Sequence, residues 1–540
     1  MLLKRALKQK YLAPALLIGA VAALVSLGFV TGAFDRLEHL AFDKRMQQFR
    51  HNKQLPDEIA IIMIDEASVT AMNSLLGRFP WPRAVYGDLL EFLALGGARA
   101  VIFDVLFTEN ERGADGLVAG TSPSDARLVV ATEESGVAIH AAQLIADSPD
   151  QSNAGILNRP LPDVFVQQFS LPTVKGLPET RNNFYLLPFD GLWQASAAVG
   201  IVGVDPDEDG VYRRLKPVHG YGAAWFPGHS LVGLLDRVSV KQVELKDGHL
   251  RLDGLVVPVD EEGQFLVNLY GHMRSYSISG IFSSLARLKA GDVEGMKILP
   301  DEFAEKIVYV GASAVGLEDV KPTALSGKTP GVMLHASAAG NFLTNDFLRV
   351  VPRSLTLLLI LAFSVTSGAA IFYTSNFWIR SGMPLLLAVG YLGIGIWQFE
   401  VNLVFHLVAP LVAMVLSWLV AFAYLSFTEG KDRKRVHKMF SQYVNEAVLS
   451  EVMDNYESFL ASRVGKREEL SVLFSDIRGF TTISESLEPE QVVELLNCHF
   501  DKMTDVIFEN RGTLDKFIGD AIMAFWGAPV RVANHADLAM

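Results

Sequence analysis

The chain has 540 residues, of which 50% are hydrophobic and 20% are charged. This length exceeds one ordinary domain and the apolar content exceeds that of typical soluble chains, so we expect about three or four domains with part of the chain in lipid. The net charge of −13 argues against nucleic acid as the main partner. The single cysteine, Cys498, excludes an internal disulfide and a Cys-based zinc site.

The first predicted element is a transmembrane helix over residues 11–34, which contain no charged residue. This run is longer than the about 7–15 apolar residues of a cleaved signal peptide, so we favour an uncleaved span over a secretory signal. Three further apolar runs, at residues 355–373, 383–399 and 403–427, complete four predicted transmembrane helices. An even number of spans places both ends of the chain on the same side of the membrane.

Basic residues identify that side as the cytoplasm. They cluster in the N-terminal residues 1–10 and in the run KDRKRVHK at Lys431–Lys438, so the positive-inside rule predicts a multi-pass protein of the inner (plasma) membrane with residues 35–352 outside the cytoplasm. The second basic cluster is also expected to contact membrane lipid or to take part in signalling. His406, inside the fourth predicted span, is compatible with a proton path in a transporter, but we favour a hydrogen bond to a neighbouring helix.

The external residues 35–352 alternate between strand-like and helical patterns. Short apolar runs rich in β-branched residues, which are typical of buried strands, occur at Glu58–Asp65, Arg99–Phe107, Ala197–Val204 and Lys306–Ser313. Residues Pro82–Gly96 predict an amphipathic helix that begins at a proline and ends at a glycine. Together these patterns predict a three-layer α/β domain.

An enzymatic role for this external domain is an alternative, because it contains possible acid and base residues. These are Asp65, Asp104, His272 and His335. No nucleophile motif or metal-ligand spacing connects them, so we favour structural roles such as the capping of turns.

Five motifs in the external region resemble, in their order and spacing, the extracytoplasmic sensor domain called CHASE2. They are IDE at Ile64–Glu66, FPWPR at Phe79–Arg83, GARAVIFDVLF at Gly97–Phe107, VYVGASAVGLEDVKPT at Val308–Thr323 and PGVMLHASAAGNFL at Pro330–Leu343. The resemblance covers about Asp35 to Val350, and the three closely spaced spans that follow are also similar to that family. It implies a sensory module that responds to an unknown extracytoplasmic stimulus.

A helical linker is predicted over residues 428–464, after the fourth span. Val436, Phe440, Tyr443 and Ala447 recur at helical spacing and form one apolar seam. The seam extends over only about two heptads, whereas a coiled coil is indicated by three or four. Pairing of two copies of the chain through this linker is therefore a suggestion.

The last region, residues 465–540, combines a strand, a helix and a hairpin. The apolar run LSVLFSD ends in Asp476 and leads into the glycine-containing turn IRGFT. An amphipathic helix is predicted from Glu488 to Gly512, followed by two strands around the turn Gly519-Asp520. This order is half of a ferredoxin-like βαββαβ fold, in which neighbouring strand ends bring Asp476 and Asp520 together.

Two carboxylates without a histidine or thiolate suit a hard cation. Magnesium or manganese with a polyphosphate fits best, because Mg²⁺ is usually held by one or two carboxylates together with substrate phosphates. A pair of such ions activates an attacking oxygen and neutralises a leaving pyrophosphate. The residues by themselves therefore indicate metal-assisted phosphoryl chemistry.

The motifs VLFSDIRGFTTISE at Val472–Glu485 and GTLDKFIGDAIMAFWGAP at Gly512–Pro529 strongly resemble the two metal-aspartate motifs of class III nucleotide cyclases. The resemblance implies that Asp476 and Asp520 are catalytic and hold two Mg²⁺ or Mn²⁺ ions. It further implies that the Ile477 carbonyl assists, that Gly479, Phe480 and Thr481 line the triphosphate of ATP, and that Lys516 recognises adenine. Active sites in this family lie between two catalytic domains, so a homodimer through the linker and cyclase domain is expected.

The chain is thus expected to be a multidomain membrane protein with an α/β extracytoplasmic sensor domain, four transmembrane helices, a helical linker and the N-terminal half of a ferredoxin-like α+β cyclase domain. The expected function is a receptor adenylate cyclase that makes cyclic AMP from ATP. The family places a second adenine contact and transition-state Asn and Arg residues in the other half of the domain, so residues 1–540 alone are expected to be inactive.

Two alternatives remain open. One is a sensor or signalling protein whose cyclase domain is catalytically silent. The other is a guanylate cyclase, although Lys516 argues for adenine. The Gly-Gly-Asp/Glu-Glu-Phe signature of diguanylate cyclases is absent from the sequence.

Overall fold

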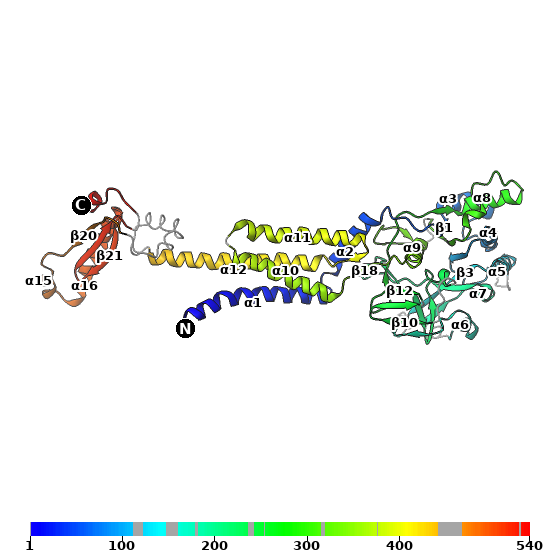
Figure 1. The fold of residues 1–540 in the computed structure, drawn as a ribbon, viewed down its shortest axis with the longest axis horizontal. Coiled ribbons are helices and arrows are strands. Elements are labelled where there is room, and N and C mark those ends of the chain that lie inside the picture. The colour runs from blue at the N-terminus through cyan, green and yellow to red at the C-terminus, as the bar shows by residue number, and fades with distance from the viewer. Residues whose placement is uncertain are drawn as a thin grey trace. The chain divides into compact units, whose positions relative to one another are not determined.

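The computed structural model describes residues 2–111, 122–146, 160–178, 182–235, 242–252, 254–314, 319–374, 376–440, 467–528 and 531–540. The chain forms two compact units (Figure 1). One comprises Gly19–Ala370 and Asn376–Ser417, and therefore contains the external domain. The other comprises Met1–Ile18, Ile371–Ser375 and Trp418–Met540, and therefore contains the C-terminal strands and helices.

A seven-stranded sheet forms the centre of the external domain. Its strands run in the order β14 (Ser275–Ser277), β1 (Ile59–Ile64), β15 (Ile307–Ala312), β2 (Ala100–Asp104), β3 (Ala138–Ala146) and β5 (Asn182–Leu186), and β6 (Ala198–Ile201) also pairs with β3. All pairs are parallel except β3 with β5. Every residue of β1 is buried, as expected for a parallel strand covered on both faces. The four predicted strands are confirmed as β1, β2, β6 and β15.

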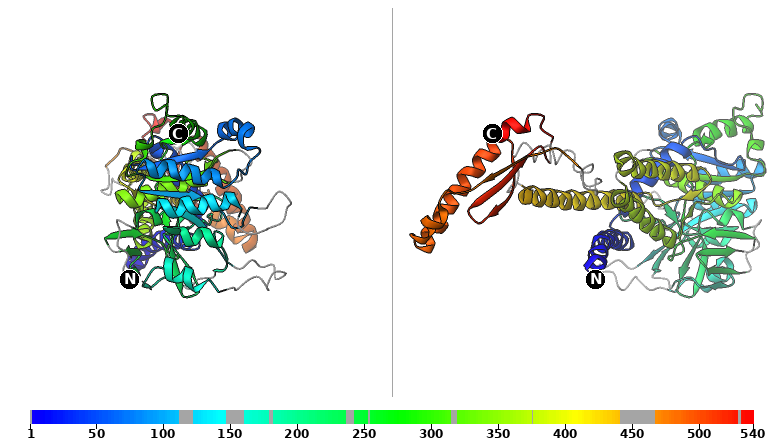
Figure 2. Two further views of the ribbon diagram at one scale, coloured as in Figure 1. Left: turned by 90° about the vertical axis from the view of Figure 1, so that its right-hand side faces the viewer. Right: turned by 60° about the vertical axis from the view of Figure 1, so that its left-hand side comes forward.

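Helices cover both faces of this sheet (Figure 2). On one face, alternate residues of β1 such as Ile62 pack with α3 (Glu66–Leu76), α4 (Ala84–Leu95), α5 (Pro123–Ser135) and α8 (Ile278–Lys289). On the other face, residues such as Ile61 pack against α9 (Gly331–Thr344). The predicted three layers and the predicted helix at Pro82–Gly96, which is α4, are confirmed.

Smaller elements surround the central sheet. One sheet has the order β12 (Leu255–Pro258), β11 (His249–Leu252), β10 (Val243–Lys246) and β4 (Val174–Lys175). Two-stranded pairs are β7 (Arg214–Leu215) with β13 (Phe265–Leu266), β8 (Val218–Tyr221) with β9 (Ala224–Pro227), and β16 (Val320–Lys321) with β17 (Thr329–Pro330). The short helices are α6 (Asp163–Phe169), α7 (Asp190–Ala195), η2 (Val232–Leu234) and η3 (Pro300–Phe303).

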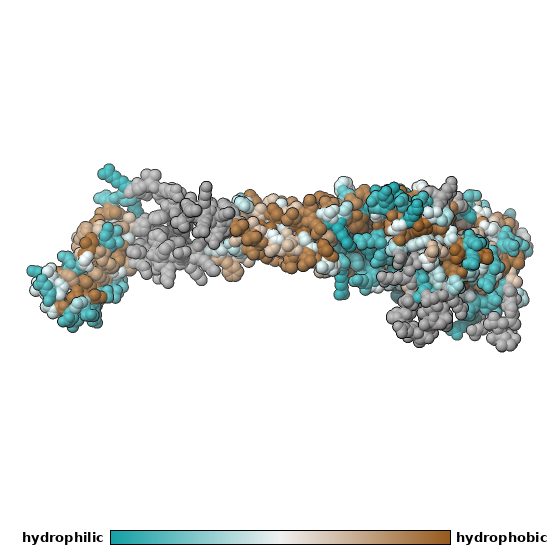
Figure 3. All heavy atoms as spheres, turned by 90° about the horizontal axis from the view of Figure 1, so that it is seen from below, coloured by the Kyte–Doolittle hydropathy of each residue, from teal (hydrophilic) through white to brown (hydrophobic). Residues whose placement is uncertain are grey.

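Four helices are long and apolar enough to cross a membrane, by length and composition. They are α1 (Leu2–Val30), α10 (Arg353–Tyr373), α11 (Phe377–Glu400) and α12 (Val408–Phe440). Their apolar stretches are Leu12–Val30, Arg353–Tyr373, Trp378–Glu400 and Val408–Thr428. The surface formed by these helices is predominantly hydrophobic, as a lipid-facing surface would be (Figure 3).

The start of the fourth long helix differs from the prediction. Leu403–Val404 form strand β19, which pairs in parallel with β18 (Arg349–Val350), and α12 begins only at Val408. His406 therefore lies in the turn before the helix rather than inside it. The expected hydrogen bond to a neighbouring helix is confirmed, since Thr356 Oγ1 of α10 lies 3.0 Å from His406 Nδ1.

A further helix, α2 (Asp35–Arg50), follows α1 after a short turn and belongs to the external unit. It buries Phe42 and Met46, and the same face also buries the charged side chains Glu38, Arg45 and Arg50. Charged side chains are rarely buried without partners, so their hydrogen bonds determine what this helix does.

The C-terminal residues form a three-stranded antiparallel sheet with the order β20 (Ser471–Ser475), β22 (Ala521–Trp526) and β21 (Thr513–Ile518). One face of the sheet packs against α16 (Pro489–Glu509). Helices α15 (Phe480–Glu485) and α17 (His535–Ala539) complete this part. The predicted apolar seam lies partly outside the described residues, because Tyr443 and Ala447 fall within residues 441–466.

Candidate active site

The antiparallel register places the two predicted metal aspartates at the same end of the C-terminal sheet. Ser475, the last residue of β20, pairs with Ile522 of β22. Asp476 directly follows Ser475, and Asp520 directly precedes Ala521, the first residue of β22. The two carboxylates therefore extend from neighbouring strands at one sheet edge, as the sequence predicts.

A glycine turn follows Asp476. Gly479 has φ +75°, a left-handed conformation that favours glycine, and it is the N-cap residue of α15. Phe480 N–H donates to the Ile477 carbonyl at 3.1 Å, and the N–H groups of Thr482 and Ile483 donate to the Gly479 carbonyl at 3.1 and 3.2 Å. A carbonyl oxygen has two lone pairs, so Ile477 remains able to accept a second partner such as a cation.

The hairpin that presents Asp520 is a two-residue turn. Ile518 pairs with Ala521, so Gly519 and Asp520 alone connect β21 and β22, and Gly519 has φ +66°. Such tight turns match the right-handed twist of the flanking strands and require glycine, or residues such as Asn and Asp, at their centre. Asp520 is half-buried, whereas Asp476 is exposed.

The carboxylates of Asp476 and Asp520 have no Lys, Arg or His within 4.0 Å among the residues that the structure describes. Their oxygens, together with the Ile477 carbonyl, form an all-oxygen donor set at an accessible sheet edge. Such a set suits Mg²⁺ or Mn²⁺ better than a softer metal. The residues present therefore fit the divalent cations that the sequence implies.

A β-bulge determines the direction of Lys516. Leu514 pairs with Ala524 and Lys516 pairs with Met523, so the register shifts at Asp515 between them. Leu514 is buried on the α16 face, and without the extra residue Lys516 would point to that same face. Instead Lys516 projects from the open face, where its side chain is 59% exposed and its Nζ lies 3.1 Å from Asp515 Oδ2.

Helix α16 supports this sheet from its other face. Ile507 is buried among Leu514, Ile522 and Trp526, and Phe500 stacks on Phe517 with ring centroids 4.3 Å apart. Glu488 caps the helix in a capping box with Gln491, and Gly512 N–H donates to the Ile507 carbonyl at 2.7 Å. The predicted helix is confirmed, although it ends at Glu509, three residues earlier than predicted.

The possible acid and base residues of the external domain do not form a comparable site. Asp65 caps α3 by accepting from Ser68 N–H at 2.8 Å, which confirms its structural role. Asp104 ends β2, His335 is buried in α9, and His272 is exposed in a loop. Within the described ranges, the one group of His, Cys, Asp or Glu side chains with metal-ligand spacing is His39, Asp207 and Asp209.

That group is already neutralised by a buried arginine. Arg213 is 2% exposed and pairs with Asp207 at 3.0 Å, with Asp209 at 2.8 Å and with Asp43 at 2.7 Å. A cation bound among these carboxylates would have to displace or repel the guanidinium, so the group is an ion-pair network rather than a metal site.

The sequence interpretation missed the buried charged residues of α2. Glu38 accepts backbone N–H groups of Leu407, Val408 and Ala409 at 2.8, 2.7 and 3.2 Å. The available signal was the position of charged residues such as Glu38 on the same helical face as Phe42 and Met46.

Comparisons with known proteins agree with both halves of this description. The model of the CHASE2 domain matches residues 17–369, and that of the adenylate and guanylate cyclase catalytic domain matches residues 463–540. Adenylate cyclase 1 of Rhizobium meliloti is 36% identical over 98 residues, which are 18% of this chain and 14% of that protein. An adenylate cyclase of Anabaena cylindrica is 32% identical over 108 residues, which are 20% of this chain and 22% of that protein.

A solved structure, that of the guanylyl cyclase Cya2, is 48% identical over a segment that covers 14% of this chain and 38% of that one, with a TM-score of 0.14. The matched segments thus span less than a quarter of the two curated relatives. The CHASE2 match, by contrast, covers more than half of the chain. The chain therefore belongs to the CHASE2 family, and its residues 463–540 belong to an adenylate and guanylate cyclase catalytic domain.

Proposed function

We propose that the protein is a membrane receptor adenylate cyclase that converts ATP to cyclic AMP and pyrophosphate. The observation that supports this most is the register of β20 with β22, which places Asp476 and Asp520 at one sheet edge beside the Gly479 turn. The names of the two adenylate cyclase relatives support it further.

Asp476, Asp520 and the Ile477 carbonyl would hold two Mg²⁺ or Mn²⁺ ions. When bound, such ions activate the attacking hydroxyl and neutralise the leaving pyrophosphate. Gly479, Phe480 and Thr481 would line the triphosphate in the turn that follows Asp476, where the Phe480 N–H is already bonded to the Ile477 carbonyl.

Lys516 is proposed to select adenine in a site shared by two copies of the chain. It projects from the open face of the sheet, away from α16, and is accessible to a partner. In a homodimer the aspartates of one copy would serve an ATP whose base meets Lys516 of the other. Since class III cyclases read adenine with a lysine at the position that Lys516 resembles, cyclic AMP is favoured over cyclic GMP, and guanylate cyclase activity is the second candidate.

The strand order β20, β22, β21 with α16 on one face is consistent with the first half of a ferredoxin-like domain. We propose the following arrangement along the chain. Residues 1–10 are cytoplasmic, the spans lie at about 11–34, 355–373, 383–399 and 403–427, the sensor lies outside at 35–352, and the linker at 428–464 leads to the cyclase domain at 465–540. The fourth span is then taken to begin at Val408, where the helix starts.

Helix α2 provides a physical basis for regulation by the external domain. Besides the Glu38 contacts with the start of α12, Arg45 Nη1 donates to the Phe405 carbonyl at 3.2 Å. Arg50 Nη2 donates to the Phe399 carbonyl and to Asn402 Oδ1, both at 2.8 Å. Glu38, Arg45 and Arg50 thus attach the turn between α11 and α12 to helix α2. We call these three side chains the α2 clamp.

The α2 clamp contacts the first residues of a helix that continues without interruption from Val408 to Phe440, toward the linker. A stimulus that shifts α2 would therefore shift the start of α12. We propose that this displacement is the route by which an extracytoplasmic event alters the shared active site.

The decisive experiment is to measure cyclic AMP and cyclic GMP made by the full-length protein in membranes with Mg²⁺ or Mn²⁺. We expect cyclic AMP from the native protein and a loss of at least about a hundredfold in Asp476→Ala and Asp520→Ala, because each removes a charged metal ligand. Asp505→Ala, an exposed carboxylate on α16, is the matched control.

Activity that survives the Asp476 and Asp520 substitutions would remove the metal assignment. No cyclic nucleotide from the full-length native protein under any stimulus would instead favour the silent sensor. Cyclic GMP as the main product would favour the guanylate cyclase.

A further inference from the structure

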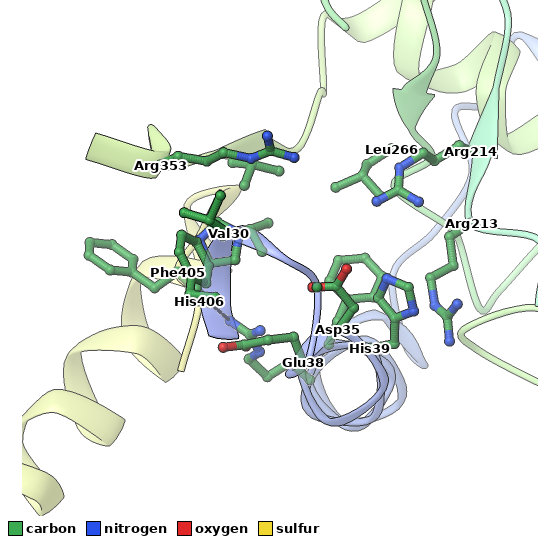
Figure 4. Close-up of a pocket in the computed structure, with 16 residues that line it drawn as sticks. Val30, Asp35, Glu38, His39, Arg213, Arg214, Leu266, Arg353, Phe405 and His406 are labelled. Carbon is green, nitrogen blue, oxygen red and sulfur yellow. Dashed lines mark hydrogen bonds between the residues drawn. The ribbon is translucent and has the colours of Figure 1, made fainter. Parts of the chain in front are cut away.

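A pocket of about 200 Å³ lies in the external unit, where α1 ends and where α10 and α12 begin (Figure 4). Its walls include the apolar side chains Phe29, Val30 and Leu266. Its other lining residues are unusually rich in charge, with four arginines, one aspartate, one glutamate and two histidines. A charged side chain in this pocket can bind a ligand only if it has no partner within the protein. The partners of each charged side chain therefore decide what the pocket can bind.

Most of these charged groups already have partners within the protein. Glu38 accepts three backbone N–H groups, and Arg45 Nη1 donates to the Phe405 carbonyl. Arg213 is surrounded by three aspartates, and His39 Nδ1 lies 3.6 Å from Asp209 Oδ2. Arg214 pairs with Asp207 at 2.5 Å and more loosely with Asp260 at 3.7 Å.

Two lining charges of opposite sign are left. Asp35 and Arg353 are both exposed, and in the described part of the chain neither has an ion-pair partner within 4.0 Å, not even the other. Figure 4 shows them on different elements, Asp35 at the start of α2 and Arg353 at the start of α10. The pocket therefore presents a separated positive and negative charge to whatever enters it.

A ligand with both charges would complement this pattern. A phosphate group suits Arg353, because a guanidinium group binds phosphate oxygens in a bidentate manner. A primary ammonium group suits Asp35, because it donates hydrogen bonds that a quaternary ammonium group lacks. A purely anionic ligand is disfavoured, because Asp35 and the neighbouring aspartates would repel its second charge.

The position of the pocket indicates the source of such a group. Val30 and Arg353 are the terminal residues of two of the candidate membrane-spanning stretches, so the pocket lies at the level where these stretches end. That level corresponds to lipid headgroups if the helices span a bilayer, as proposed above. We propose that the pocket binds the phosphoethanolamine headgroup of a zwitterionic phospholipid, with the phosphate at Arg353 and the ammonium at Asp35.

The test is lipid retention by the full-length protein purified in mild detergent, measured by native mass spectrometry with added short-chain lipids. Phosphatidylethanolamine is compared with phosphatidylcholine, phosphatidylglycerol and free phosphoethanolamine at equal concentration. We expect phosphatidylethanolamine to bind at least about tenfold more tightly than the other three, as expected for two charge-assisted contacts plus the apolar wall.

Arg353→Gln should reduce binding of phosphatidylethanolamine at least about tenfold, because it removes the phosphate partner. Asp35→Asn should reduce it to the level of phosphatidylcholine, because only the ammonium contact is lost. Arg349→Gln and Asp57→Asn remove exposed charges that do not line the pocket and should leave binding unchanged. Arg353→Lys and Asp35→Glu, which keep each charge, should retain the selectivity and show that folding is intact.

Equal retention of all lipids, or unchanged binding in both Arg353→Gln and Asp35→Asn, would overturn the proposal. Free phosphoethanolamine binding as tightly as the lipid would also overturn it, because a soluble metabolite would then be the ligand. Tighter binding of phosphatidylglycerol would show an anion site instead. None of these readings depends on cyclic nucleotide formation, so the result stands apart from the proposed cyclase activity.

Discussion

At the scale of single residues, the carboxylates of this protein have different surroundings. Asp476 is exposed and Asp520 is half-buried at one end of the C-terminal sheet, where the proposed function places the metal ions. Glu38 is buried but is satisfied by three backbone N–H groups. Asp104 is different again, because its Oδ2 atom is buried and has no hydrogen-bond partner among the described residues, although the residue keeps some exposure.

The surroundings of Asp104 lead to a prediction about pH. Burial raises the pKa of Asp104 from 3.8 to about 6, although nearby His229 and Lys321 act in the opposite direction and Asp319 acts in the same direction. A carboxyl group with a raised pKa contributes stability below its unfolded-state pKa, and that contribution is lost as pH rises through the folded-state value. Asp104→Asn, which carries no charge, should therefore stabilise the protein above about pH 6 relative to the native chain.

We expect Asp104→Asn to raise the free energy of unfolding by about 1–3 kcal/mol at pH 8 and to leave it unchanged near pH 4. The range follows from about 1.4 kcal/mol for each unit of pKa shift, reduced because the side chain is partly exposed. Thermal unfolding of the full-length protein across this pH range measures it, with Asp57→Asn as the surface control. A native protein that is more stable than Asp104→Asn at pH 8 would show that the carboxylate has a partner there.

Residue identity was predictable from sequence where local pattern and chemistry coincide. Asp476 follows a short apolar strand and Asp520 follows a glycine in a tight turn, so their positions at one sheet edge were predictable from strand order, and their role as metal ligands stays a prediction. The buried charges of α2 were not, because Glu38, Arg45 and Arg50 are buried only through contacts with residues several hundred positions away. No local pattern contains such contacts.

At the scale of secondary-structure elements, a β-bulge decides to which face of the sheet the side chain of Lys516, the proposed adenine contact, projects. The extra residue at Asp515 sends Lys516 to the open face of the sheet and Phe517 to the α16 face, where it stacks on Phe500. From the sequence we expected a regular strand here. A bulge shifts the alternation of side chains between the two sheet faces by one residue, and a strand prediction from two-residue periodicity does not allow for that shift. Likewise the predicted start of the fourth long helix was wrong by several residues, because Leu403–Val404 pair with β18 instead of joining the helix.

Deletion of Asp515 tests the role of this bulge. A regular β21 would turn Lys516 toward α16 and Phe517 toward solvent, so we expect loss of cyclic AMP formation and destabilisation by about 1–3 kcal/mol. Asp515→Asn keeps the extra residue and loses only an exposed ion pair, so it should change stability by less than about 1 kcal/mol and keep most activity. Equal loss in both variants would assign the effect to the carboxylate rather than to the bulge.

The α2 clamp gives a second prediction at this scale. Glu38→Ala leaves three backbone N–H groups at the start of α12 without their acceptor, which we expect to cost about 1–3 kcal/mol and to uncouple cyclase output from the external domain. Glu58→Ala, an exposed glutamate just before β1, is the control. Hydrogen exchange at Leu407, Val408 and Ala409 measures the effect directly, and unchanged protection at these amides would contradict the proposed clamp.

At the scale of the whole molecule, the chain combines a three-layer external domain, four long apolar helices and a cyclase segment. The strands of the external layers were predictable because they are continuous apolar runs, as in β1 and β15, and the helices because they carry apolar residues at helical spacing or over their whole length, as in α4 and α10. The proposed coupling between parts was not predictable, because it rests on the contacts of α2 with the α11–α12 turn. If the proposed receptor mechanism holds, a signal enters through the external unit and reaches the cyclase segment through α12.

The central claim, that this protein is an adenylate cyclase whose active site is shared by two copies, is tested most directly by complementation. Asp476→Ala and Lys516→Ala full-length chains are each expected to make little cyclic AMP alone, because every site in either homodimer lacks one essential side chain. Coexpressed, they form heterodimers in which one of the two sites is intact, so cyclic AMP formation should return to a substantial fraction of the native rate. No recovery in demonstrably mixed dimers, or full activity of either variant alone, would contradict the account.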